Sequence, residues 1–161
     1  STIFMVGERK DELDGCLYYS INEELGANIP NPDIDEVKNQ IYAITDSIDR
    51  NLINSCHDIS DGGVAITLSE MTFEKNIGCS VNIPGELSTE KLLFSETGGF
   101  IFEVGDSNID SIKKIFQDYN VDIYLIGETS KQKHIRINGK IDLKTDEAKK
   151  VWLNGLRNKI R

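Results

Sequence analysis

Two short loops rich in glycine, hydroxyl and carboxyl groups are the parts of this sequence in which chemistry can be expected. The first is Asp58-Ile59-Ser60-Asp61-Gly62-Gly63, between an extended segment and a helical pattern. Glycine lets a phosphate approach the backbone closely, and the start of a helix offers unpaired N–H groups and a partial positive charge. Asp58 can at the same time hold Mg²⁺, which prefers one or two acids together with phosphate oxygens.

The same loop also has a purely structural interpretation. Ser60 or Asp61 can cap the following helix, and Gly62 and Gly63 can form a tight turn. On spacing alone this interpretation is favoured, because glycine loops with a capping residue are common.

A second loop of the same kind is Ser95-Glu96-Thr97-Gly98-Gly99, just before an apolar strand. It can add a hydroxyl, an acid and free amides to the same pocket, although on its own a turn leading into a strand is favoured. A shared site requires both loops to lie side by side, at the rim where another domain would dock. Loops at opposite ends of the sheet would favour the structural interpretation.

The remaining reactive residue types give no further site. His57 could act as a general acid or base, but a single histidine beside a short strand is more often a hydrogen-bonded structural residue. Cys16, Cys56 and Cys79 lie far apart, which predicts reduced core thiols and neither a disulfide framework nor a zinc site. No nucleophile with its base, Walker motif or G-x-G-x-x-G can be assembled, so no catalytic residue is assigned. Any bound metal is expected to be hard and oxygen-ligated.

Periodic apolar residues predict the elements that position these loops. Alternating or short apolar runs indicate strands, and apolar residues every three or four positions indicate helices. Strands are expected over 2–6, 52–56, 79–83, 100–104 and 121–126, with a hairpin of 134–137 and 140–143 around a type I′ turn at Asn138-Gly139. Helices are expected over 32–50, 64–76, 109–119 and 146–160, and residues 7–32 are expected to be a polar connection. This interleaving predicts an α/β or α+β domain built in layers.

Two helices carry more detailed expectations. For the first helix, Asn31-Pro32-Asp33 offers a cap, a proline at the first helical position and an acid in the first turn. Its predicted inward stripe consists of Ile34, Val37, Ile41, Ile44 and Ile48. In the closing helix Val151, Trp152 and Leu156 are expected to face inward, although Asn154-Gly155 can end it early.

Length and charge limit the class of protein. The 161 residues predict one domain, 1–161, that folds as a single cooperative unit. The 27 acidic and 18 basic residues give a net charge of −9, which argues against nucleic acid or an anionic membrane as a partner. No apolar run approaches the roughly 20 residues that span a bilayer, so a cytoplasmic protein is expected. A start at Ser1 fits either removal of a methionine or excision from a longer polypeptide.

Several motifs in order resemble one enzyme family, phosphoribosylformylglycinamidine synthase II of purine biosynthesis. The first loop with its flanks, from Cys56 to Ala65, resembles the signature H-D-x-S-[DE]-G-G-[LV] in the C-terminal half of that family. Three further stretches match its L-F-S-E-[ST]-x-G, G-E-T…E-L-G-G and I-G-E-V/T motifs: Leu93–Gly99, Val6–Gly15 and Ile126–Thr129. The closing Trp152 helix also fits, so the resemblance runs from end to end.

Two departures from the family pattern stand out. Asp14-Gly15-Cys16-Leu17-Tyr18 stands where the family often has G-G-S-E-Y, which removes a serine and an acid. Phe100 stands where an arginine commonly follows the second glycine loop, which removes a possible phosphate contact.

The resemblance implies a fold and a function. The fold is that of the C-terminal domain of aminoimidazole ribonucleotide synthetase, a layered mixed sheet that is partly ferredoxin-like. The activity is an ATP-dependent ligase reaction in which the formamide oxygen of formylglycinamide ribonucleotide is activated and ammonia from glutamine then forms an amidine. ATP and Mg²⁺ are bound mainly by N-terminal ATP-binding domains of the same polypeptide, and a glutaminase subunit and a small bridging subunit are the further partners. The isolated domain is expected to be inactive.

Two other classes of function stay open. The domain can be a non-catalytic scaffold or a module for a structural nucleotide. It can also belong to another member of the superfamily, namely selenophosphate synthetase, the hydrogenase maturation factor or thiamine monophosphate kinase, although the opening and closing motifs fit these less well. Substrate, catalytic ATP and a structural nucleotide are all compatible with the residue types of the loops.

Overall fold

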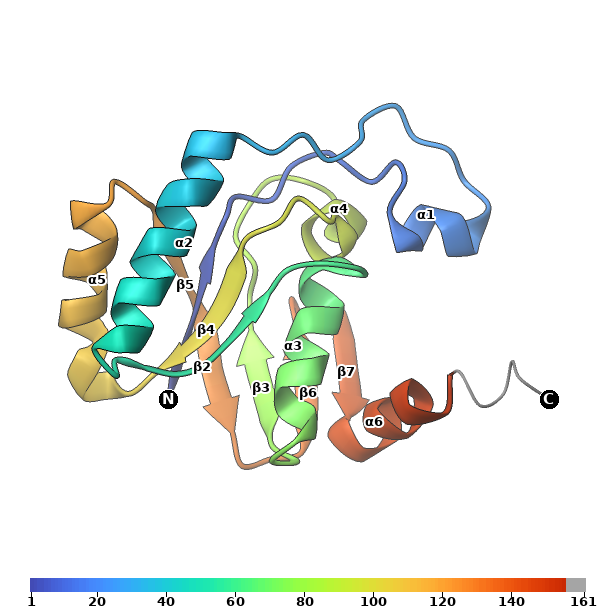
Figure 1. Cartoon of the computed structure of the whole chain (residues 1–161). Coiled ribbons are helices and arrows are strands. Elements are labelled where there is room, and N and C mark those ends of the chain that lie inside the picture. The colour runs from blue at the N-terminus through green and yellow to red at the C-terminus, as the bar shows by residue number, and fades with distance from the viewer. Residues whose placement is uncertain (156–161) are drawn as a thin grey trace.

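The computed structural model describes residues 1–155, which form a seven-stranded sheet in the order β2-β4-β1-β5-β3-β6-β7 (Figure 1). All neighbouring strands are antiparallel except β3 and β6, which are parallel. The strands are β1 (Thr2–Val6), β2 (Ile53–Asp58), β3 (Gly78–Val81), β4 (Phe100–Val104), β5 (Ile123–Ser130), β6 (His134–Ile137) and β7 (Ile141–Lys144). The helices are α1 (Leu17–Asn22), α2 (Ile34–Asp49), α3 (Gly63–Phe73), α4 (Thr89–Phe94), α5 (Ile109–Asp118) and α6 (Thr145–Asn154), with a 3₁₀ turn at Asp106–Asn108.

One face of the sheet is covered by α2 and α5. Phe4 and Val6 of β1 and Phe102 of β4 point to this face and pack with Ile112 and Phe116 of α5. The units β1-α2-β2 and β4-α5-β5 interlock in the strand order β2-β4-β1-β5, which is the ferredoxin-like arrangement of two split βαβ units. The expected mixed, partly ferredoxin-like α+β fold is therefore confirmed.

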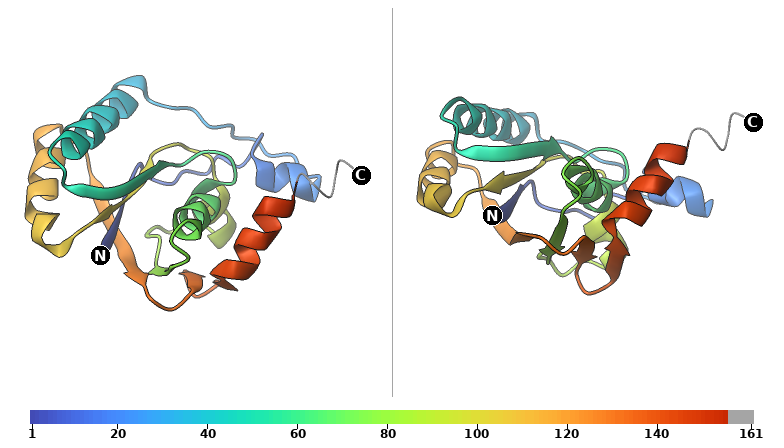
Figure 2. Two further views of the ribbon diagram at one scale, coloured as in Figure 1. Left: turned by 60° about the horizontal axis from the view of Figure 1, so that its bottom comes forward. Right: turned by 90° about the horizontal axis from the view of Figure 1, so that it is seen from below.

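The opposite face of the sheet is covered by α3 and α4. Successive side chains of a strand point to opposite faces, so Ile3 and Met5 of β1 and Ile101 of β4 pack with Val64 and Leu68 of α3. Figure 2 shows from two further directions that α2 lies beside α5, and that α6 lies beside α3. One sheet thus separates two apolar clusters.

The first long helix begins later and buries a different stripe than the sequence predicts. Its N-cap is Asp33, whose carboxylate accepts hydrogen bonds from the backbone N–H groups of Asp35 and Glu36 at 3.0 and 3.1 Å. The buried residues are Gln40, Ala43, Ile44 and Ser47, whereas the predicted inward residues Ile34, Ile41 and Ile48 are 74 %, 42 % and 46 % exposed. The stripe that contains Ala43 and Ile44 packs with β1, β4 and α5, so the stripe of Ile34, Ile41 and Ile48 is turned to solvent. The buried Ser47 donates its hydroxyl to the Ala43 carbonyl at 2.7 Å, which satisfies it within the helix.

The closing helix also differs from its prediction. Val151 and Trp152 were expected to face inward but are 74 % and 54 % exposed. The reason is that α6 follows the edge strand β7 and packs along α3 at the edge of the sheet, where the Trp152 ring lies 5.7 Å from the Phe73 ring. Leu156 and the rest of 156–160 lie outside the described residues.

Short helices were missed, whereas the hairpin and the core positions of Cys16 and Cys79 were predicted correctly; Cys56, predicted as a core thiol, is only half-buried. The six-residue helices α1 and α4 are too short to show a period, and Tyr18 of α1 stacks on Phe94 of α4 with ring centres 4.7 Å apart. Asn138 and Gly139 both have positive φ, as the type I′ turn requires. All three cysteines are free, and burial raises the pKa of the Cys56 and Cys79 thiols to about 11.

Within residues 1–155, no helix combines the length and the apolar character that a membrane crossing requires.

Candidate functional site

The two glycine loops lie side by side, as a shared site requires. Strands β2 and β4 pair so that Asp58 is opposite Phe100, which brings the end of one loop to the end of the other. The Ile59 N–H then donates to the Gly99 carbonyl at 2.8 Å, and the Gly62 N–H donates to a Glu96 carboxylate oxygen at 2.8 Å. Loops at opposite ends of the sheet would have favoured the purely structural interpretation, and this arrangement is not found.

The first loop turns the chain from β2 into α3 without a side-chain cap. The N-cap of α3 is Gly62, with φ of 80°, and neither Ser60 nor Asp61 provides a capping hydrogen bond, so the predicted cap is wrong. The turn is closed by the Gly63 N–H, which donates to the Ser60 carbonyl at 2.9 Å. The side chains of Ser60 and Asp61 are left exposed at the tip of the loop, while Ile59 is buried and anchors it.

In the second loop, Glu96 connects three segments of the chain. One of its carboxylate oxygens accepts hydrogen bonds from Gly62, at the start of α3, and from the Leu17 N–H at 2.9 Å, at the start of α1. Ser95 is buried, and its hydroxyl accepts a hydrogen bond from the Thr97 hydroxyl at 3.2 Å. These three side chains fix the shape of the loop from within, and Gly98 lies at its open side, with no neighbouring atom where a Cβ would stand.

A buried arginine that the sequence analysis missed supports the second loop from behind. Arg9 is 5 % exposed, and its guanidinium donates to the carbonyls of Gly7, Ser95 and Gly98. Burial lowers the pKa of Arg9 to about 10, so the group is still charged at neutral pH. Phe100, at the family's arginine position, instead packs against the α2–α5 cluster. Arg9 had no sequence signal, because it follows Gly7-Glu8 in a polar stretch.

Replacing Arg9 with alanine is expected to lower the free energy of unfolding by about 2–4 kcal/mol, because several carbonyls lose their donor inside the protein. Arg9→Lys keeps the charge but not the planar fork, so we expect an intermediate loss. Urea denaturation of the 161-residue chain measures both, with exposed Lys114→Ala on α5 as the control. A loss in Arg9→Ala no larger than the control's would show that the guanidinium does not hold the loop.

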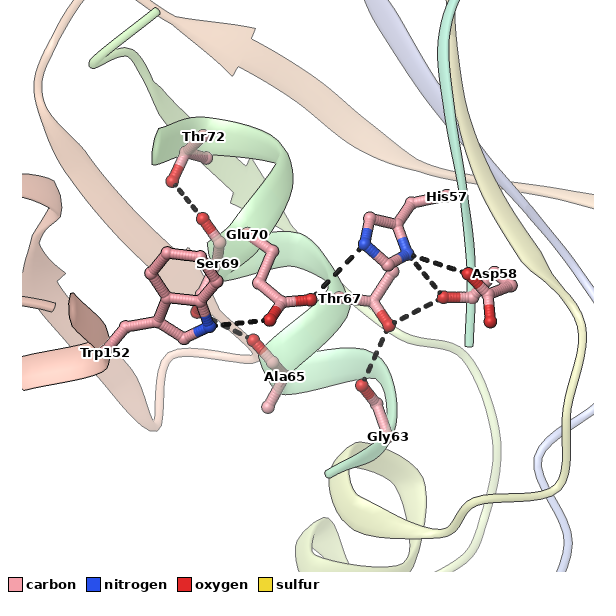
Figure 3. Close-up of polar contacts among 9 residues, drawn as sticks. All are labelled: His57, Asp58, Gly63, Ala65, Thr67, Ser69, Glu70, Thr72 and Trp152. Atoms are coloured by element: carbon pink, nitrogen blue, oxygen red, sulfur yellow. Dashed lines mark hydrogen bonds and ion pairs between the residues drawn. The ribbon is translucent and has the colours of Figure 1, made fainter. Parts of the chain in front are cut away.

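His57 is the centre of a polar chain that reaches from the first loop to α6 (Figure 3). Its Nδ1 lies 2.7 Å from the Asp58 carbonyl and 3.2 Å from the Asp58 carboxylate, and its Nε2 lies 3.3 Å from a Glu70 carboxylate oxygen. The other Glu70 oxygen accepts the indole N–H of Trp152 at 2.7 Å. Since both ring nitrogens are engaged, the geometry favours the structural over the acid–base interpretation of His57.

Asp58 offers an exposed carboxylate at the start of the first loop. Its side chain is 63 % exposed, and its contact with His57 leaves room for other ligands. Within residues 1–155 there is no group of three or more histidine, cysteine, aspartate or glutamate side chains that could hold a metal ion. One carboxylate fits a Mg²⁺ ion that takes its remaining ligands from water, phosphate or another domain. Asp58 is thus suited to a shared site and not to a complete one.

Residues 1–140 match the family described as AIR synthase related protein, C-terminal domain. The chain is a member of this family. A curated relative in it, phosphoribosylformylglycinamidine synthase subunit PurL of Methanothrix thermoacetophila, is 34 % identical over 165 residues, which cover 99 % of this chain and 22 % of the relative. The chain spans about a fifth or less of the length of the first curated relatives that it matches.

Several solved structures share the fold of this chain. Thermotoga maritima PurL complexed with FGAR superposes with a TM-score of 0.77 at 15 % identity, over 91 % of this chain and 27 % of that one. The same protein complexed with ATP superposes with a TM-score of 0.71 at 16 % identity, over 91 % of this chain and 25 % of that one. Thiamine-monophosphate kinase from Stenotrophomonas maltophilia superposes with a TM-score of 0.58 at 15 % identity, over 86 % of this chain and 50 % of that one. At these identities the likeness concerns the fold alone.

Proposed function

We propose that this chain is the C-terminal domain of an ATP-dependent phosphoribosylformylglycinamidine synthase. The observation that carries the proposal is the junction of the two glycine loops, whose sequences are the family-like motifs and whose backbones bond directly at Ile59–Gly99 and Gly62–Glu96. Similarity to PurL over 99 % of the chain favours this enzyme over thiamine monophosphate kinase and the other superfamily members.

The loops are proposed to present a phosphorylated ligand to the rest of the enzyme. The residues proposed to form this site are Asp58, Ser60, Asp61, Gly62, Gly63, Ser95, Glu96, Thr97, Gly98 and Gly99, of which Ser95 is fully buried and supports its loop from within. Within this set the exposed Ser60, Asp61 and Asp58 are the groups free to reach a ligand, whereas Glu96 acts by holding the loops together. Mg²⁺ bound with Asp58 as one ligand would neutralise phosphate charge at the mouth of the site.

The partners of the chain follow from the same proposal. N-terminal ATP-binding domains of the same polypeptide would supply most of the nucleotide contacts, and a glutaminase subunit and a small bridging subunit would deliver ammonia. The net charge of −9 on this chain would repel small anionic metabolites. Binding of such ligands therefore needs cations or other domains that offset this charge, which agrees with a shared Mg²⁺ site. We place the enzyme in the cytoplasm.

The full-length protein that contains this chain is expected to form the amidine from formylglycinamide ribonucleotide, ATP and ammonia, and the isolated 161-residue chain is expected to form none. The reason is that the exposed carboxylates of Asp58 and Asp61 and two glycine loops do not hold ATP and activate an amide oxygen without further groups. Product formation followed by chromatography checks both proteins, with thiamine monophosphate as the rival substrate.

Either of two results would contradict this assignment. Inactivity of the folded full-length protein toward formylglycinamide ribonucleotide, with nucleotide still bound, would favour a module for a structural nucleotide. Phosphorylation of thiamine monophosphate would favour the kinase branch of the superfamily.

A further inference from the structure

Glu70 contacts His57 with one carboxylate oxygen and Trp152 with the other, and His57 in turn contacts Asp58, the candidate Mg²⁺ ligand. It lies on α3, two turns beyond Gly63, and its side chain is 28 % exposed. One oxygen is 3.3 Å from His57 Nε2, and the other accepts the Trp152 indole N–H at 2.7 Å. Figure 3 shows Glu70 between these two aromatic side chains, one from β2 and one from α6. The carboxylate is therefore held in one orientation from both sides.

The His57 imidazole, which is oriented by Glu70, in turn contacts Asp58. With Nε2 held at Glu70, Nδ1 faces the Asp58 carbonyl at 2.7 Å and a carboxylate oxygen of the same residue at 3.2 Å. The Thr67 hydroxyl lies 3.1 Å from the Asp58 carbonyl oxygen and 3.1 Å from the Gly63 carbonyl oxygen, so its single hydrogen is shared between these two acceptors. The backbone of Asp58 is thus fixed by α3, while its second carboxylate oxygen has no hydrogen-bond or ion-pair partner among residues 1–155.

We propose that Glu70 is a positioning residue, which orients the Asp58 carboxylate through His57 and is itself held by Trp152. The proposal rests on the proposed function, in which Asp58 is a ligand of Mg²⁺ bound with a nucleotide. Exposed carboxylates have several rotamers, and a ligand held in one of them loses less entropy on binding the ion. The position of α6 on α3 thereby contributes to the cation site, although no α6 residue reaches it.

Glu70→Gln tests this role in the full-length protein. The amide has one acceptor oxygen, so it cannot satisfy the donors of both Trp152 and His57. We expect the concentration of Mg²⁺ needed for half-maximal binding of a non-hydrolysable ATP analogue to rise about tenfold, as for other residues that orient metal ligands. Trp152→Phe, which keeps the contact with Phe73 and loses the N–H, should give a smaller rise in the same direction.

A double-mutant cycle separates positioning from a general structural effect. If Glu70 acts through Asp58, Asp58→Asn combined with Glu70→Gln should be no weaker in Mg²⁺ binding than Asp58→Asn alone. Exposed Glu74→Gln, just beyond α3, is the matched control and should leave Mg²⁺ binding unchanged.

The outcomes distinguish this inference from the function on which it rests. A full effect of Asp58→Asn with none of Glu70→Gln would overturn the positioning role alone, as would additive effects in the double variant. No effect of Asp58→Asn would overturn the assignment of Asp58 as a Mg²⁺ ligand. A tenfold rise with a non-additive double variant would establish Glu70 as a positioning residue.

Discussion

Replacing Gly99 with alanine is expected to lower the free energy of unfolding by about 3–5 kcal/mol, among the largest effects of one methyl group in this chain. Gly99 has φ of 114°, which side chains rarely adopt, and a Cβ there would stand 2.2 Å from the Val6 carbonyl oxygen. The carbonyl of Gly99 also accepts the Ile59 N–H, so a shift of its backbone would separate the two loops.

The neighbouring Gly98 is a matched control for this substitution. It has φ of 73°, but a Cβ there would meet no atom within 4 Å. Gly98→Ala should therefore cost only about 1–2 kcal/mol, the strain of the left-handed conformation. Urea denaturation of the two variants measures the difference, and equal losses would mean that strain alone, and not contact between β1 and the second loop, requires glycine at position 99.

The central strands and long helices could be predicted from the sequence, because local pattern and tertiary burial agree there. Ile3, Phe4 and Met5 are all apolar, which predicts a strand with two buried faces. Both faces of β1 are indeed covered by helices. Where the prediction failed, at the inward stripes of α2 and α6, the burial was decided by neighbours far away in the sequence. Ile34 and Val151 have the spacing of core residues and are exposed, since no element in residues 1–155 covers them.

The sequence predicted the two loops of the candidate site, but not the side chains that hold these loops in place. Glycine, hydroxyl and acid residues marked both loops, and their juxtaposition follows from the pairing of β2 with β4. The residues that hold the loops were hidden, because their roles depend on contacts across the fold: Arg9 reaches Gly98, and Trp152 reaches Glu70. A sequence pattern records neighbours along the chain, and these pairs are separated by 89 and 82 residues.

Asp58→Asn in the full-length protein is the second substitution for which we expect a large effect, a weakening of Mg²⁺-nucleotide binding by at least about tenfold. Asparagine keeps the shape and one acceptor oxygen of the side chain and removes its charge. The carboxylate is 63 % exposed, so its loss should change the free energy of unfolding by no more than about 0.5 kcal/mol. Isothermal titration with Mg²⁺ and a non-hydrolysable ATP analogue measures the binding, and urea denaturation measures the stability.

Two comparisons show whether the charge acts locally. Asp49→Asn, at the exposed end of α2, removes the same charge far from the loops and should leave binding unchanged. Asp61→Asn removes a charge from the loop tip, and an equal or larger effect there would make Asp61 the preferred ligand. Unchanged nucleotide affinity together with lost stability in Asp58→Asn would identify Asp58 as a structural residue of the turn, because an exposed carboxylate can affect folding strongly only through its contacts with His57 and the loop backbone.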